Sequence, residues 1–209
     1  MAPLAEITTA AGAFISMVSH KTKAIFWLLP RTGSRSVGDI IAEFEFVDPK
    51  TGLSLTEQHS HYVGIPEGCE GYHISCTVRN PLSWVVSCWH FWGHEMTFPQ
   101  FVRSNGVFLP FNYLQKVEKL AEPHAWIRLE SAESDLLQVD YIREANVNMD
   151  ACFRENRHSS DNGIVLKRDP KNSRYSDYLS YYTEKELNKV HKIYEKYFEK
   201  FGYAKETPE

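Results

Sequence analysis

A short polar turn with two arginines follows an apolar run near the N-terminus. Residues 26–37 have the sequence FWLLPRTGSRSV. Pro30 ends the apolar run, and residues 30–36 can form a small polar loop. Hydroxyl groups, closely spaced backbone N–H groups and guanidinium groups all bind phosphate or sulfate. The residue types of this turn therefore predict an anion-binding site.

The turn is expected to join a buried strand to a helix. Residues 24–29 form an unbroken apolar run, which is typical of a strand buried on both faces. A helix is predicted to begin near Ser34, because apolar residues then recur with helical spacing at Val37, Ile40, Ile41 and Phe44. The turn lacks the Gly-Lys pair of an ATP-binding loop and the repeated glycines of a dinucleotide-binding loop, so it matches neither.

A second strand-to-helix junction carries another arginine with serines. Residues 72–78 predict a core strand that ends at Arg79, and Pro81 is suited to the first position of the helix that follows. Ser87 lies about two turns into that helix and shares a face with Ser83. Two anion sites on successive strand–helix units indicate a nucleotide with phosphates at both ends.

The remaining pattern favours a single α/β domain over residues 1–209, with a central, mostly parallel sheet flanked by helices. A third strand is expected at 125–129, a helix within 133–145, and residues 1–22 as an N-terminal extension. A long C-terminal helix is predicted to begin at Thr183, paired with Glu186 in a capping box, and to end at Gly202.

Composition excludes several classes of protein. The formal net charge of −4 argues against a general nucleic-acid binder, and no apolar run approaches the ~20 residues that span a bilayer. The first residues lack the basic start of a signal peptide. Four cysteines without a CxxC pair predict reduced thiols rather than a metal site. We expect a soluble, cytoplasmic protein without membrane or nucleic-acid partners.

One segment differs in charge from the rest of the chain. Residues 154–174 hold six Lys or Arg against three acids, and we interpret the stretch 154–182 as a basic loop or lid over an anion. Its candidate anion-binding residues are Lys167, Arg168 and Arg174.

These motifs together resemble those of the sulfotransferases that use 3′-phosphoadenosine-5′-phosphosulfate (PAPS). Residues 30–36 look like the family's 5′-phosphosulfate loop, and residues 77–87 resemble its 3′-phosphate motif, an arginine and a serine eight positions apart. Residues 127–130 are similar to a family strand that ends in an acid, and residues 182–203 to its closing helix with a final Phe-Gly-Tyr. The match runs in order from about residue 23 to 203.

The resemblance implies a P-loop NTPase-like sulfotransferase fold and transfer of a sulfuryl group from PAPS to a hydroxyl or amine, without a metal. The acceptor would be a small molecule, a glycan or a phenol, and the nucleotide product would be adenosine 3′,5′-bisphosphate (PAP). Arg31 would hold the bridging oxygen and Arg79 with Ser87 the 3′-phosphate, while the basic loop completes the site. The 5′-phosphosulfate would be bound by Thr32, Gly33, Ser34, Arg35 and Ser36.

The acceptor must lose a proton, so a base is needed beside it. The resemblance implies His61 as the first candidate for this base and His59 as the second. The alternative base is a carboxylate, from Glu43, Glu45 or Glu57. Two other functions stay open. A kinase-like nucleotide-dependent phosphotransferase would require magnesium, and a non-catalytic protein that binds an adenosine bisphosphate would show no turnover.

Overall fold

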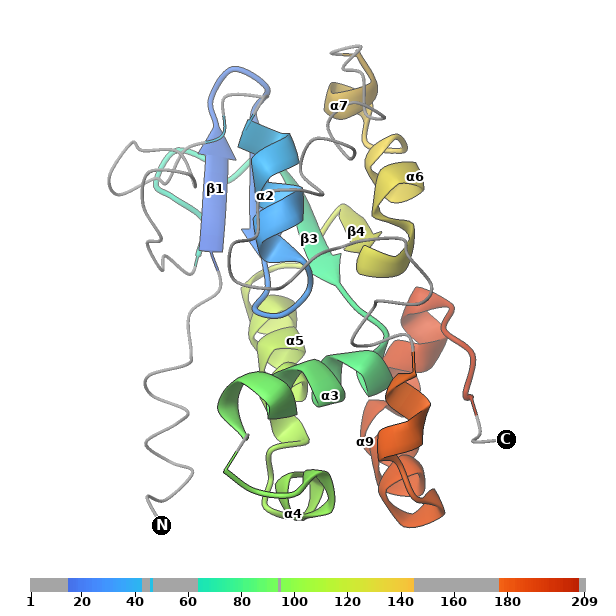
Figure 1. The fold of residues 1–209 in the computed structure, drawn as a ribbon. Helices are drawn as coiled ribbons and strands as arrows, with labels where there is room; N and C mark the ends of the chain where they lie inside the picture. The colour runs from blue at the N-terminus through green and yellow to red at the C-terminus, as the bar shows by residue number, and fades with distance from the viewer. Residues whose placement is uncertain (1–14, 43–45, 47–63, 94, 145–176, 207–209) are drawn as a thin grey trace. The chain divides into compact units, whose positions relative to one another are not determined.

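A computed structural model describes residues 15–42, 46, 64–93, 95–144 and 177–206 (Figure 1). The described residues divide into two compact units, and each is described by itself. The sheet unit comprises described residues 15–78 and 120–144, and the helical unit comprises described residues 79–119 and 177–206.

Within the described residues, four strands form one sheet in the order β1-β2-β3-β4. β1 (Ile15–Ser19) pairs antiparallel with β2 (Ala24–Leu28), whereas β3 (His73–Val78) and β4 (Ala125–Arg128) continue the sheet parallel to β2. One row of the register crosses the whole sheet, through Met17, Phe26, Ser75 and Ala125. The mostly parallel sheet with its helices confirms the predicted α/β class.

The three strands predicted from apolar runs are confirmed to within one residue at each end. β1 was not predicted, and it lies inside residues 1–22, which were expected to be an N-terminal extension. Serines at positions 16 and 19 interrupt its apolar pattern, yet both side chains are buried with Met17 and Val18. β1 therefore forms through hairpin pairing with β2. The local sequence pattern does not reveal this pairing.

Three helices of the sheet unit pack against one face of the sheet (Figure 1). They are α2 (Ser34–Ala42), α6 (Ala132–Leu136) and α7 (Asp140–Glu144). The predicted start of α2 is confirmed, and its apolar stripe packs on this face through Val37, Ile40 and Ile41; Phe44 lies outside the described residues. The helix expected within 133–145 is instead two short helices, because a turn at 137–139 lets Leu136, Val139 and Ile142 all reach the core.

The helical unit contains α3 (Pro81–Trp92), α4 (Phe98–Arg103), α5 (Phe108–Leu120), the 3-10 helix η2 (Tyr178–Tyr181) and α9 (Glu184–Phe201). The predicted start of α3 at Pro81 is confirmed, and the Asn80 side chain caps it by accepting from the Leu82 N–H group at 2.9 Å. Tyr194 of α9 ties this unit together, since its hydroxyl donates to the Val107 carbonyl at 2.6 Å.

α9 begins and ends where the sequence indicates, but its cap differs from the predicted capping box. The Thr183 hydroxyl donates to the Glu186 carboxylate, and the Thr183 side chain accepts no hydrogen bond from the backbone of the helix. Glu186 is 5% exposed, so the hydroxyl serves to satisfy a buried carboxylate. Gly202 ends the helix in the left-handed conformation, with φ of +69°.

Two kinds of structure are missing from the described residues. No described helix combines the length and apolar character needed to cross a membrane. In the same residues, no three His, Cys, Asp or Glu side chains gather in a group that could hold a metal ion.

Two histidines meet where β3 and β4 begin. The His73 and His124 rings stack at 4.8 Å between centroids, and Tyr141 of α7 packs edge-on to His73. The Ile74 N–H group donates to Nδ1 of His124 at 3.0 Å, while Nε2 of His73 is buried without a hydrogen-bond partner. Burial lowers the pKa of His73; His124 lowers it further and Asp140 raises it.

We expect the sheet unit to lose stability on mild acidification through His73. A pKa lowered in the folded state means that the unfolded chain binds the proton first, so stability falls as the pH drops below about 6.5. The free energy of unfolding, measured in urea at pH 7.5 and pH 5.5, should fall more for the wild type than for His73→Phe, which keeps the stacked ring. Equal losses in the two proteins would contradict this assignment.

Candidate functional site

The polar turn lies where the parallel strand β2 ends and α2 begins, in the sheet unit. Leu29 is fully buried and continues the strand direction, and α2 starts five residues later at Ser34. The carboxyl ends of parallel strands are the usual place for ligands in open α/β sheets. The predicted strand–turn–helix arrangement is therefore present. We call its turn, residues 29–33, the anion loop.

A ring of hydrogen bonds fixes the anion loop to the neighbouring strand β3. The Leu29 N–H group donates to Oγ1 of Thr77 at 3.0 Å, and Oγ1 of Thr32 donates to the Leu29 carbonyl at 2.6 Å. The two threonine hydroxyls lie 2.6 Å apart. If Thr77 donates to Thr32, every hydroxyl proton and the N–H group has an acceptor, and the ring closes.

The ring changes what Thr32 does. Its side chain is 0% exposed and its hydroxyl is bonded to Leu29 and Thr77, so it points into the protein. In this conformation the hydroxyl that the sequence assigned to the anion instead positions the loop. Thr77 was not among the predicted site residues. A threonine in a buried strand was the signal, because a buried hydroxyl needs a partner.

The loop backbone alternates in the sign of φ. Arg31 has φ of +65° and Gly33 has φ of +74°, while Thr32 between them has no positive φ. Left-handed residues in a turn are one ingredient of the N–H nests that favour anions, and the Thr32 N–H group itself donates to the Leu29 carbonyl at 3.4 Å. A left-handed arginine is costly, and such outliers concentrate at functional sites.

The N-terminus of α2 follows the anion loop directly. The first helical hydrogen bond runs from the Val37 N–H group to the Gly33 carbonyl at 3.0 Å. The N–H groups of residues 34–36 thus precede any intrahelical acceptor, and the helix dipole makes this end partially positive. Ser34 is partly exposed here. For Arg35 and Ser36 the structure describes the backbone alone.

Leu129, just after β4, packs against the anion loop from another strand. A Cβ atom added to Gly33 would lie 2.3 Å from Cδ1 of Leu129, so no other residue fits there without movement. Leu129 begins the 3-10 helix η1 (Leu129–Ser131). The loop is therefore held from β3 by hydrogen bonds and from the end of β4 by packing.

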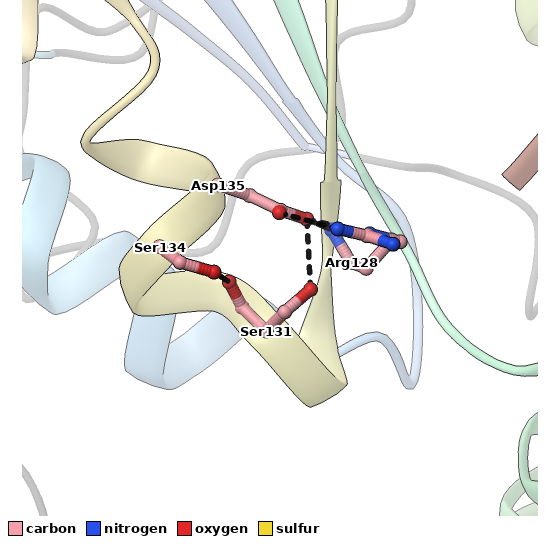
Figure 2. A network of polar contacts seen from close by, with 4 residues as sticks. All are labelled: Arg128, Ser131, Ser134 and Asp135. Carbon is pink, nitrogen blue, oxygen red and sulfur yellow. Dashed lines mark hydrogen bonds and ion pairs between the residues drawn. The ribbon is translucent and has the colours of Figure 1, made fainter. Parts of the chain in front are cut away.

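An ion pair fixes the direction of the chain as it leaves β4 (Figure 2). Asp135 accepts from the backbone N–H, Nε and Nη2 groups of Arg128 at 2.8, 2.9 and 2.8 Å. Ser131 also donates to it, and Ser134 donates to the Ser131 carbonyl. Burial alone would raise the pKa of Asp135, but these hydrogen bonds and the Arg128 charge lower it overall. Sequence reasoning did not predict this contact.

The second motif lies at the start of α3, in the helical unit. Arg79 is 9% exposed, and its Nε donates to the Ser83 hydroxyl at 2.8 Å; that hydroxyl lies 3.2 Å from the Asn80 carbonyl. Ser87, the predicted partner, is 1% exposed one turn further along α3. The described contact of Arg79 is thus with Ser83.

The C-terminal residues reach this motif through Tyr178. The Tyr178 hydroxyl donates to the Glu206 carboxylate at 2.5 Å and lies 3.5 Å from Nδ2 of Asn80. Tyr182 donates to the Leu82 carbonyl at 2.8 Å. The last residues of the predicted basic loop, at Tyr178 and Tyr182, therefore pack on the first turn of α3.

The other predicted site residues lie outside the described residues. These are the candidate bases His59, His61, Glu43, Glu45 and Glu57, and the basic-loop residues Lys167, Arg168 and Arg174.

Three glycines of the sheet unit differ in whether an alanine there would meet backbone strain, crowding by a neighbour, or neither. Gly33→Ala meets both a positive φ and Leu129, Gly68→Ala meets a positive φ in open space, and Gly71→Ala meets neither. We expect Gly33→Ala to lower the free energy of unfolding by about 1–3 kcal/mol, Gly68→Ala by about 1 kcal/mol, and Gly71→Ala by roughly zero. Urea denaturation measures the series, and equal losses for Gly33→Ala and Gly68→Ala would refute the Leu129 contact.

Comparison with protein-family models, with curated proteins and with solved structures gives no match for this chain.

Proposed function

We propose that this protein is a sulfotransferase that transfers a sulfuryl group from PAPS to an acceptor hydroxyl or amine. The observation that carries the proposal is the anion loop, in which two left-handed residues lead directly into the N-terminus of a helix. Gly33 has no Cβ atom, so its backbone can be approached closely by an oxyanion.

The type of anion is inferred from what the loop holds and lacks. It has arginine at position 31 and no lysine before Ser34, so it lacks the group that reaches the terminal phosphates in ATP-binding loops. A second arginine–serine motif follows at Arg79, as a 3′-phosphate would require. These features support PAPS over ATP.

Each residue of the loop would have a separate role in the transfer. PAPS supplies the sulfuryl group, which passes to the acceptor oxygen or nitrogen as its bond to the bridging oxygen breaks. The N–H groups of Gly33 and Ser34 would bind the phosphosulfate, and the Arg31 guanidinium would stabilise the charge that develops on the bridging oxygen. Arginine keeps its proton, so Arg31 would act by charge and not as a general acid.

Arg79 would contribute a contact to the 3′-phosphate. Arg79 is nearly buried, and its bond to Ser83 orients the guanidinium plane before any ligand binds. We include Ser83 beside Ser87 in this proposed site. The basic-loop residues would add further positive charge.

Nucleotide binding is the first test. PAP at about 100 times its dissociation constant should stabilise the folded protein by about 2.7 kcal/mol, which raises the melting temperature by roughly 5–10 °C. Arg31→Ala should lose transfer of radiolabel from PAPS to a panel of phenols, alcohols, amines and glycans by on the order of 100-fold, and Arg31→Lys should retain activity. Arg143→Ala, which changes an exposed arginine paired with Asp140, is the control.

Three outcomes would contradict the proposal. The absence of any stabilisation by PAP would overturn it. Stabilisation by ATP with magnesium instead would indicate a phosphotransferase. Stabilisation by PAP without transfer to any acceptor would indicate a protein that binds the nucleotide and does not react.

The base is tested separately from binding. His61→Ala should abolish transfer while the melting temperature still rises with PAP, because a base contacts the acceptor and not the nucleotide. If His61→Ala keeps activity, His59→Ala and Glu57→Gln are next, and retention in all three would remove these candidates.

A further inference from the structure

Thr77 lies on β3, outside the anion loop, yet it makes the contacts that define the loop. Its side chain is 0% exposed. Oγ1 accepts from the Leu29 N–H group at 3.0 Å, lies 2.6 Å from Oγ1 of Thr32, and lies 3.5 Å from the Trp27 carbonyl. These three partners are the end of β2 and the middle of the loop.

A hydroxyl at this position is not explained by packing of the sheet. Thr77 is opposite Ile127 in the parallel register, on the face whose other buried residues include Phe26 and Leu28. Valine has nearly the same shape and would fill the same space without a polar atom. What threonine adds is one donor and one acceptor, and both are used by the segment 27–32.

The contacts of Thr77 act on the backbone on both sides of the left-handed Arg31. Leu29 and Thr32 enclose Pro30 and the left-handed Arg31, so bonds at both ends fix the turn between them. A left-handed arginine persists when the surrounding structure holds it in place. Leu129 restrains the far side of the loop at Gly33 but contributes no hydrogen bond to this turn in the described contacts.

We infer that Thr77 is a positioning residue that holds the anion loop in its binding conformation before a ligand arrives. The inference rests on the proposed function for its effect on catalysis, whereas the effect on the loop stands on the geometry alone. Without the hydroxyl, the loop would spend part of its time in other conformations, and apparent affinity falls in proportion to the fraction that remains competent.

Three variants separate positioning from general stability. Thr77→Val keeps the shape and removes the hydroxyl, and Thr77→Ser keeps the hydroxyl. Ser75→Ala is the matched control, since Ser75 is also 0% exposed on β3 and shares its hydrogen bond with Tyr141 rather than with the loop. Thr77→Cys, whose thiol is a weak donor, takes the place of Thr77→Val if the valine variant does not fold.

The first measurement needs no ligand. Limited trypsin digestion followed by mass spectrometry gives the rate of cleavage after Arg31, which requires the loop to open. We expect Thr77→Val to be cleaved there several times faster than the wild type, and Thr77→Ser and Ser75→Ala to be cleaved at about the wild-type rate. Cleavage of Thr77→Val at the wild-type rate would overturn the inference.

The second measurement uses PAP and calorimetry. Thr77→Val should bind PAP roughly tenfold more weakly, Thr77→Ser within about threefold of the wild type, and Ser75→Ala with unchanged affinity despite lower stability. In the transfer assay the loss in Thr77→Val should be in KM for PAPS more than in kcat. Equal affinity in Thr77→Val and wild type would overturn the inference. If the wild type binds no PAP, the proposed function fails, and the trypsin result still decides the role of Thr77.

Discussion

The contact between the Thr32 and Thr77 hydroxyls is the interaction on which the candidate site depends. It joins a loop to a strand that lies 45 positions later in the chain, and both groups are fully buried. A buried pair of hydroxyls is stable when all its donors and acceptors are satisfied, as the bonds to Leu29 achieve here. These hydrogen bonds therefore fix the loop to the parallel sheet.

The parallel arrangement of β2, β3 and β4 is what makes such a contact possible. Parallel strands end at the same edge, so the residues that follow β2 and β4 and those near the end of β3 meet. Thr77 and Leu129 reach the anion loop in this way from two different strands. The Arg128–Asp135 ion pair then fixes the course of the chain after β4.

The sequence predicted elements whose signal is local. The apolar run of β2, the helical spacing of α2 and the proline at the start of α3 each depend on residues close in the chain, and each prediction is confirmed. β1 was not predicted, because its two serines interrupt the apolar pattern and are buried in the strand that pairs with β2. The predicted box at Thr183 formed differently because a buried carboxylate at Glu186 takes the hydroxyl proton.

The sequence predicted which residue types make up the candidate site, but not how their side chains are oriented. Residue types at positions 30–36 indicated an anion, and the positive φ of Gly33 agrees with that interpretation. Which way Thr32 faces depends on Thr77, and the contact of Arg79 with Ser83 depends on side-chain torsions; neither follows from spacing.

The left-handed Arg31 has a consequence for protein engineering. Glycine at position 31 would relax the backbone, so selection for thermal stability alone would tend to replace the arginine and discard its charge.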